Sequence, residues 1–200
     1  MNYYQEITLI DHTEITPYFI WSKLYNQLHL ALAETKQNEN QINIGVSFPD
    51  YRYKHEEEKK SVITLGKKLR LFANQQELLE KLNLKAKLER LADYVHITSI
   101  RPVPQTKVTG YVSFCRKQIK SNAERLARRR VNKVGDISFE EAVQRYQNGI
   151  KTTDLPYIQL NSLSNTQPFK LFIEKRQGEK SSDFEFSSYG LSSKSTVPEF

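Results

Sequence analysis

Alternation of apolar and polar residues predicts four strands in the first hundred residues. The second is the clearest, because every other position from Ile42 to Phe48 is apolar while the positions between are polar or small, which is typical of a half-buried strand. Pro49 and Asp50 then end the run. The four strands are expected at residues 3–10, 42–48, 65–72 and 94–100.

Two helices are expected between these strands. Residues 16–36 carry apolar side chains at helical spacing, and Asn74 with Glu77 forms a capping-box-like start for a second helix. The very polar residues 51–60 predict a solvated loop. The resulting order, β-α-β-β-α-β, is that of the ferredoxin-like fold, which RNA-recognition modules often use.

The chain changes character after Pro102 and Pro104, so we expect a domain boundary near residue 100. The second half predicts a basic helix that starts at Ser121 or Asn122. A second helix is expected from Ser138, with Glu141 at the capping-box position, and should end near Asn148-Gly149. Strand-like runs follow at residues 157–163, 169–175 and 183–189. The predicted fold class is α+β: a ferredoxin-like (RRM-like) domain over 1–100, then an α+β half over 101–200 with a linker, an arginine-rich helix and β-hairpins.

Composition is that of an ordinary globular chain, with 38% hydrophobic and 26% charged residues among 200. Cys115 is the sole cysteine, which excludes an intramolecular disulfide framework and a multi-cysteine zinc site. The N-terminal residues lack a signal-peptide pattern, and we expect a soluble, cytoplasmic protein. The four histidines have no metal-ligand spacing, so neither a metal nor a cofactor is expected.

The net charge of +7 comes from one stretch, Arg116–Lys133, which holds eight basic residues and a single acid. Arg125, Arg128 and Arg129 would project from one side of a helix, whereas Arg130 lies nearer its apolar side. A charge run of this kind is either a solvated helical face or a nucleic-acid footprint, and its one-sidedness favours the footprint. Charge does not separate RNA from DNA, but the extended character of 105–118 disfavours a helix-turn-helix.

Six segments spread over the whole chain are informative together: SKLYNQLHLAL, INIGVSFPD, LGKKLRLFA, RKQIKSNAERLARRR, LPYIQLNSLSNTQPFKLFI and YGLS. In their order and spacing they resemble the subtype I-F CRISPR repeat-processing endoribonucleases, which cut the stem-loop repeats of precursor CRISPR RNA. The resemblance implies metal-independent attack of a 2′-hydroxyl on its own phosphate at the 3′ base of the hairpin. The products would be a 2′,3′-cyclic phosphate and a 5′-hydroxyl.

The resemblance also implies a catalytic set. His29 matches the family's catalytic histidine, Ser162 the serine that orients the 2′-hydroxyl, and Tyr189 the tyrosine that positions the histidine. Without the resemblance each has an ordinary explanation, namely a packed helical histidine, a strand-end serine and a core aromatic residue beside a glycine turn.

RNA recognition carries over to other positions. Arg116 and Gln118 match a linker that reads base edges, and Phe169 matches an aromatic residue that stacks beneath the closing base pair, although its alternation with Leu171 also fits a core position. The helix along the stem would contribute Lys120, Arg125, Arg128 and Arg129. The expected partners are the repeat RNA and other subunits of an RNA-guided interference complex. A non-catalytic protein that caps a guide RNA is the alternative.

Overall fold

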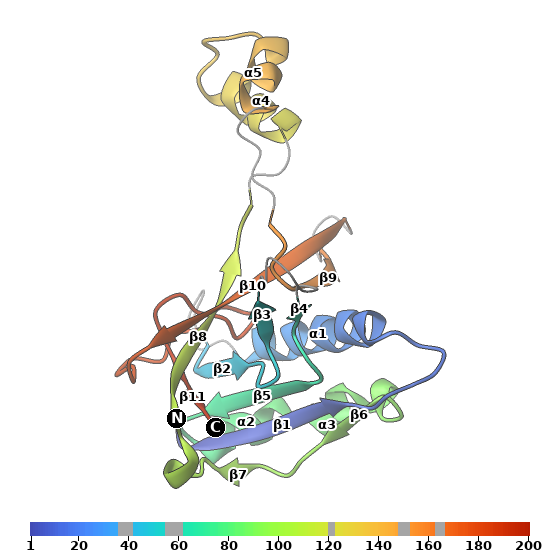
Figure 1. Cartoon of the computed structure of the whole chain (residues 1–200), viewed down its shortest axis with the longest axis vertical. Coiled ribbons are helices and arrows are strands. Elements are labelled where there is room, and N and C mark those ends of the chain that lie inside the picture. Colours follow the sequence, from blue (N-terminus) through green and yellow to red (C-terminus); the bar gives the residue numbers. More distant parts are fainter. Residues whose placement is uncertain (36–41, 55–61, 120–122, 148–152, 163–166) are drawn as a thin grey trace. The chain divides into compact units, whose positions relative to one another are not determined.

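A computed structural model describes residues 1–35, 42–54, 62–119, 123–147, 153–162 and 167–200 (Figure 1). The described chain divides into two compact units. The larger unit combines residues 1–116 with residues 155–200, and the smaller unit is the intervening segment 117–154.

The first sheet of the larger unit follows the predicted strands closely. Its four main strands are β1 (Tyr3–Leu9), β2 (Ile44–Ser47), β5 (Lys68–Ala73) and β6 (Val95–Ile97). They lie in the order β2-β5-β1-β6 and every neighbouring pair is antiparallel. A short strand, β7 (Arg101–Pro102), also pairs with β1. The strand expected at 94–100 is therefore shorter and is followed by a second short segment.

Helices occupy the two intervals where they were expected. α1 (Pro17–Glu34) begins with Pro17, whose fixed φ suits the first helical turn, and buries one apolar stripe from Ile20 to Leu32. The second interval contains α2 (Gln76–Leu82), α3 (Leu84–Lys87) and a 3₁₀ turn, η1 (Glu89–Leu91). Asn83, at φ 43°, separates α2 from α3. The predicted capping box was wrong, because α2 is capped by Gln75 and has no side-chain cap hydrogen bond.

Two short paired strands lie at the start of the polar insert and just after it, where a solvated loop alone was expected. β3 (Arg52–Lys54) pairs antiparallel with β4 (Val62–Thr64), and the remaining insert residues lie outside the described ranges. Tyr51 anchors the base of this hairpin, because its hydroxyl donates to the carbonyl of Ile173 at 3.0 Å.

A second sheet has the order β11-β8-β10-β9. Its strands are β8 (Gly110–Lys117), β9 (Tyr157–Asn161), β10 (Pro168–Gly178) and β11 (Val197–Glu199), and a 3₁₀ turn, η2 (Gln105–Lys107), precedes β8. The strands expected near 157–163 and 169–175 are confirmed as β9 and β10. The strand expected at 183–189 was wrong: Phe186 makes only an isolated bridge with Ile42, and a turn follows it.

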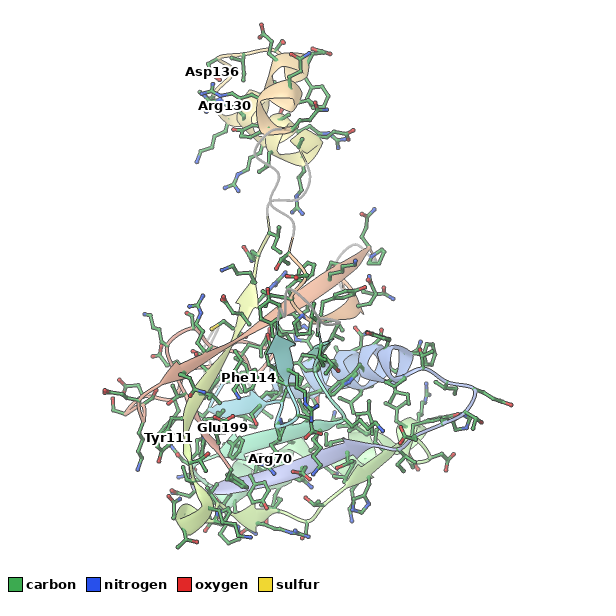
Figure 2. The ribbon with its side chains drawn as sticks, viewed as in Figure 1. Arg70, Tyr111, Phe114, Arg130, Asp136 and Glu199 are labelled. Atoms are coloured by element: carbon green, nitrogen blue, oxygen red, sulfur yellow. The ribbon has the colours of Figure 1, made fainter. Side chains whose placement is uncertain are left out.

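The two sheets share one core, so the compact units do not follow the expected boundary near residue 100. α1 packs against β9, and the ring of Phe48 meets that of Phe114 edge-on at 5.3 Å. Arg70 on β5 donates to the carbonyl of Phe200 at 2.6 Å, which ties the chain's last residues to the first sheet. Figure 2 marks Arg70, Phe114 and Glu199 in this region.

The smaller unit is a pair of helices, α4 (Ala123–Lys133) and α5 (Phe139–Gln147), which pack together through Ala123, Ala127 and Ala142. The predicted start at Ser121 or Asn122 lies outside the described residues. The capping box of α5 is confirmed: the amide of Glu141 donates to the Ser138 hydroxyl, and the amide of Ser138 donates to the Glu141 carboxylate. Helical spacing would place Val134 on the apolar side of the basic helix, but this residue follows α4 and is 59% exposed.

Candidate active site

His29 lies on α1, one residue after the buried Leu28, and is itself half-buried. Its Nδ1 is 2.8 Å from the backbone carbonyl oxygen of Ser188. A carbonyl oxygen can only accept a hydrogen bond, so this contact requires the proton on Nδ1. In the neutral ring Nε2 then carries the free lone pair, and the imidazole can take a proton there.

Tyr189 covers the face of this imidazole. The two ring centroids are 4.1 Å apart and the planes differ by 9°, which is a parallel stack. A tight turn presents the tyrosine, because the amide of Gly190 donates to the carbonyl of Ser187 and Gly190 takes φ 69°. Only glycine adopts that φ without strain, so the Tyr-Gly pair suits this turn.

Arg116 extends the same cluster from the end of β8. Its guanidinium lies 5.6 Å from the ring centroid of Tyr189 and 5.4 Å from that of Phe169 on β10. Both separations fit cation–π contacts. The larger unit thus brings together four residues that are far apart in the sequence. The imidazole of His29 stacks on Tyr189, and the guanidinium of Arg116 contacts the rings of both Tyr189 and Phe169.

Ser162 directly follows β9, the strand that packs against the helix carrying His29. Its amide donates to the carbonyl of Gln167 at 2.9 Å, and the residue is half-buried. This backbone bond continues the β9–β10 pairing beyond Asn161 and fixes where the serine leaves the sheet.

The remaining residues expected to bind RNA belong to the smaller unit. Gln118 is exposed, as are Arg125, Arg128 and Arg129 on α4, while Lys120 lies outside the described residues. The single acid of the basic stretch, Glu124, forms an i,i+4 ion pair with Arg128 at 3.4 Å. Both partners are well exposed, so the pair contributes little to stability, and one acid offsets only one of the five basic residues of α4.

Arg130, which the sequence placed nearer the apolar side of the basic helix, has a structural role. Its Nε donates to the Asp136 carboxylate at 3.0 Å, and Figure 2 shows the two residues side by side next to α4. Hydrogen bonding to Arg130 lowers the pKa of Asp136. Arg130 therefore ties the end of α4 to the loop that leads into α5.

Metal-binding clusters and membrane-spanning helices are both absent from the described residues. Their His, Cys, Asp and Glu side chains form no group of three suited to a metal ion. None of the described helices combines the length and apolar character that a membrane crossing requires.

Residues 4–200 match a family model described as CRISPR-associated protein (Cas_Csy4). The chain belongs to this family. Two relatives are named CRISPR-associated endonuclease Cas6/Csy4, and each alignment, over 204 residues, covers the full length of both the relative and this chain. The relative from Escherichia coli (strain UTI89 / UPEC) is 36% identical, and that from Pseudomonas aeruginosa (strain UCBPP-PA14) is 37% identical. The resemblance inferred from the six segments is confirmed.

Solved structures give weaker matches to this Cas_Csy4 chain. One, described as an RAMP protein binding different RNA substrates, has a TM-score of 0.38 at 12% identity and covers 99% of both chains. A second, described as a Cas6-related gene from Pyrococcus furiosus, has a TM-score of 0.37 at 9% identity, with 99% of this chain and 98% of that chain covered. The family assignment therefore rests on the sequence matches.

Sequence reasoning missed two groups that hold the site together. Tyr25, one helical turn before His29, donates its hydroxyl proton to the carbonyl of Tyr189 at 2.8 Å, and the carbonyl of Ser188 fixes the imidazole. The spacing of Tyr25 and His29 along α1 could have drawn attention to the tyrosine. A backbone acceptor such as Ser188 leaves no comparable signal in the sequence.

Proposed function

We propose that this protein is an endoribonuclease that cuts the stem-loop repeats of precursor CRISPR RNA at the 3′ base of the hairpin. Family membership over residues 4–200 and the two relatives named as endonucleases support this proposal. The observation that carries it is the environment of His29. Its Nδ1 donates to a carbonyl and its ring stacks on Tyr189, which leaves Nε2 available as a base.

The proposed reaction uses the RNA's own nucleophile and needs no metal. The 2′-hydroxyl upstream of the cut gives its proton to Nε2 of His29, and its oxygen bonds to the adjacent phosphorus. The bond from phosphorus to O5′ breaks, O5′ takes up a proton, and the imidazole releases its proton to solvent. The products are a 2′,3′-cyclic phosphate and a 5′-hydroxyl. Such a reaction depends on in-line geometry and a correctly placed base.

Ser162 and Tyr189 complete the proposed catalytic set. We assign Ser162 to orienting the ribose 2′-hydroxyl, because a serine hydroxyl can both donate and accept a hydrogen bond. Its position after β9, the strand beside α1, supports this assignment. We assign Tyr189 to holding the plane of the imidazole, and the 4.1 Å stack supports that role.

The proposed RNA contacts use both units. Arg116 and Gln118 would read base edges at the bottom of the stem, and Phe169 would stack beneath the closing base pair. The contact between Arg116 and the Phe169 ring supports a shared role for these two residues. The basic helix, with Lys120, Arg125, Arg128 and Arg129, would contact the phosphates of the stem.

The proposed function also implies how the chain is organised and which partners it binds. We propose that residues 1–100 form a ferredoxin-like arrangement of strands and helices within the larger unit and carry the general base, and that residues 101–200 supply RNA recognition. The antiparallel order β2-β5-β1-β6, with helical segments after β1 and β5, supports the ferredoxin-like description. After cleavage the protein would stay on the hairpin as a subunit of an RNA-guided interference complex.

The decisive test is cleavage of a labelled repeat RNA in EDTA. We expect a cut at the 3′ base of the stem that is lost with His29→Ala or with a 2′-deoxy nucleotide at the cut site, while binding persists. His12→Ala is a matched control, because His12 is an exposed histidine whose ring lies against Tyr94. Tight binding without a cut would leave the non-catalytic guide-RNA cap instead, and a cut that requires magnesium would refute the metal-independent mechanism.

A further inference from the structure

Tyr25 is a buried tyrosine whose hydroxyl reaches the candidate active site. The residue has 0% exposure and lies one turn before His29 on α1. Its hydroxyl donates to the backbone carbonyl of Tyr189 at 2.8 Å, and its ring stacks on Phe48 with centroids 6.2 Å apart. Burial raises the pKa of Tyr25, so the phenol stays protonated and remains a donor.

The bond from Tyr25 is one of three that hold consecutive carbonyls of a single turn. The carbonyl of Ser188 accepts from His29 Nδ1, that of Tyr189 from the Tyr25 hydroxyl, and that of Gly190 from the amide of Val46 at 2.9 Å. Two donors come from α1 and one from β2. The backbone of the turn is therefore fixed on both sides of the tyrosine that stacks on the imidazole.

We propose that Tyr25 is a positioning residue for RNA cleavage, a role that rests on the function proposed above. Its hydroxyl holds the backbone of Tyr189, so the Tyr189 ring stays parallel to the imidazole while the neighbouring carbonyl holds Nδ1. Without the hydroxyl, the part-buried carbonyl of Tyr189 loses its donor, and the turn shifts to find another. A small shift of this kind moves the base out of line with the 2′-hydroxyl.

Tyr25→Phe tests the proposal, because it removes one oxygen and keeps the ring that packs on Phe48. We expect the single-turnover cleavage rate at saturating protein to fall about tenfold, because misplacement by about 1 Å can cost up to about 100-fold. The Kd for the repeat RNA should stay within about twofold of wild type, since Tyr25 is buried and away from solvent.

Tyr51→Phe is the matched control. Tyr51 also donates its hydroxyl proton to a backbone carbonyl, that of Ile173, and it is outside the proposed catalytic set. We expect Tyr51→Phe to keep the wild-type rate even if it loses as much thermal stability as Tyr25→Phe. Equal losses of rate in the two variants, or an unchanged rate in Tyr25→Phe, would overturn the proposal.

A second measurement separates this proposal from the proposed function. Stacking on Tyr189 should shift the His29 Cε1 proton upfield in NMR spectra of the full chain, and the ring-nitrogen signals should report a proton on Nδ1. Tyr25→Phe should reduce the upfield shift and broaden the ring signals, whereas Tyr51→Phe should not. If the wild-type protein fails to cut RNA, the proposed function fails, and the His29 signals still test whether Tyr25 positions the imidazole. Unchanged His29 signals in Tyr25→Phe would also overturn the proposal for Tyr25.

Discussion

Gly190 occupies a position where a methyl group has no room. A Cβ built there would lie 2.3 Å from Cγ2 of Val46 and 3.4 Å from Cδ1 of Leu32, and the residue takes φ 69°. The left-handed conformation costs an L residue about 1–2 kcal/mol. Crowding of a packed core typically costs about 1–3 kcal/mol more. Gly190→Ala should therefore lower the free energy of unfolding by about 2–5 kcal/mol.

Urea unfolding followed by circular dichroism measures this loss. A destabilisation of about 3 kcal/mol should also lower Tm by roughly 6–12 °C for a chain of this size. Because Gly190 follows Tyr189 in the turn, the folded fraction of the variant should also cleave repeat RNA more slowly while binding it normally.

Variants at two other glycines separate the two causes of the predicted loss of stability, namely the left-handed φ and the crowding. Gly110→Ala is the control, since a Cβ there would meet nothing within 4 Å, and its unfolding free energy should change by less than about 0.5 kcal/mol. Gly45→Ala adds crowding without a left-handed φ, because its Cβ would lie 2.6 Å from Cζ of Phe186. A free energy of unfolding for Gly190→Ala equal to that of Gly110→Ala would refute the reasoning about the turn.

Three further predictions concern the smaller unit. Arg129→Gln should reduce the slope of log Kd for repeat RNA against log salt concentration by roughly 0.7–0.9, as filter binding would measure. The cleavage rate at saturating protein should stay unchanged. An unchanged slope would argue against a phosphate contact. Ser138→Ala removes the cap that pairs with Glu141 and should destabilise α5 by about 1 kcal/mol, which faster amide exchange in α5 would report. Asp136→Asn should weaken the smaller unit at neutral pH. The pKa of Asp136 is lowered in the folded protein, so its contribution to stability is fully present above the ordinary pKa of about 3.9 and is lost as pH falls through the folded pKa. The unfolding free energies of wild type and variant should therefore converge in acid, as urea unfolding followed by NMR would measure.

Local periodicity predicted the elements that are buried on one face. The alternation from Ile42 to Phe48 and the apolar stripe of α1 both reflect a face packed on the core, and the structure has a strand and a helix there. The alternating aromatic residues near Phe186 misled the same reasoning. Phe186 fills the space beside Gly45. The carbonyls of residues 188–190 bond to two side chains of α1 and one amide of β2, so they form no regular strand pairing. That outcome depends on tertiary contacts that periodicity does not contain.

The candidate site was predictable only where side chains belong to a recognisable motif. The resemblance picked out His29 and Tyr189, and the structure stacks their rings. It gave no indication of Tyr25, because the partner of Tyr25 is a backbone carbonyl 164 residues away. The position of Arg130 near the apolar side of the helix indicated a structural role. Its partner, Asp136, could not be predicted in this way, because the turn after α4 brings Asp136 to Arg130.

The distance along the chain between His29 and the carbonyl that fixes its ring has a consequence for synthesis. The two residues are 159 positions apart. At translation rates of about 5–20 residues per second, Ser188 would leave the ribosome's catalytic centre roughly 8–30 s after His29. During that interval the imidazole has neither its carbonyl partner nor its aromatic cover. A nascent chain would therefore acquire an ordered His29 only near the end of its own translation, and the proposed cutting of RNA would be delayed until the rest of the protein has been made.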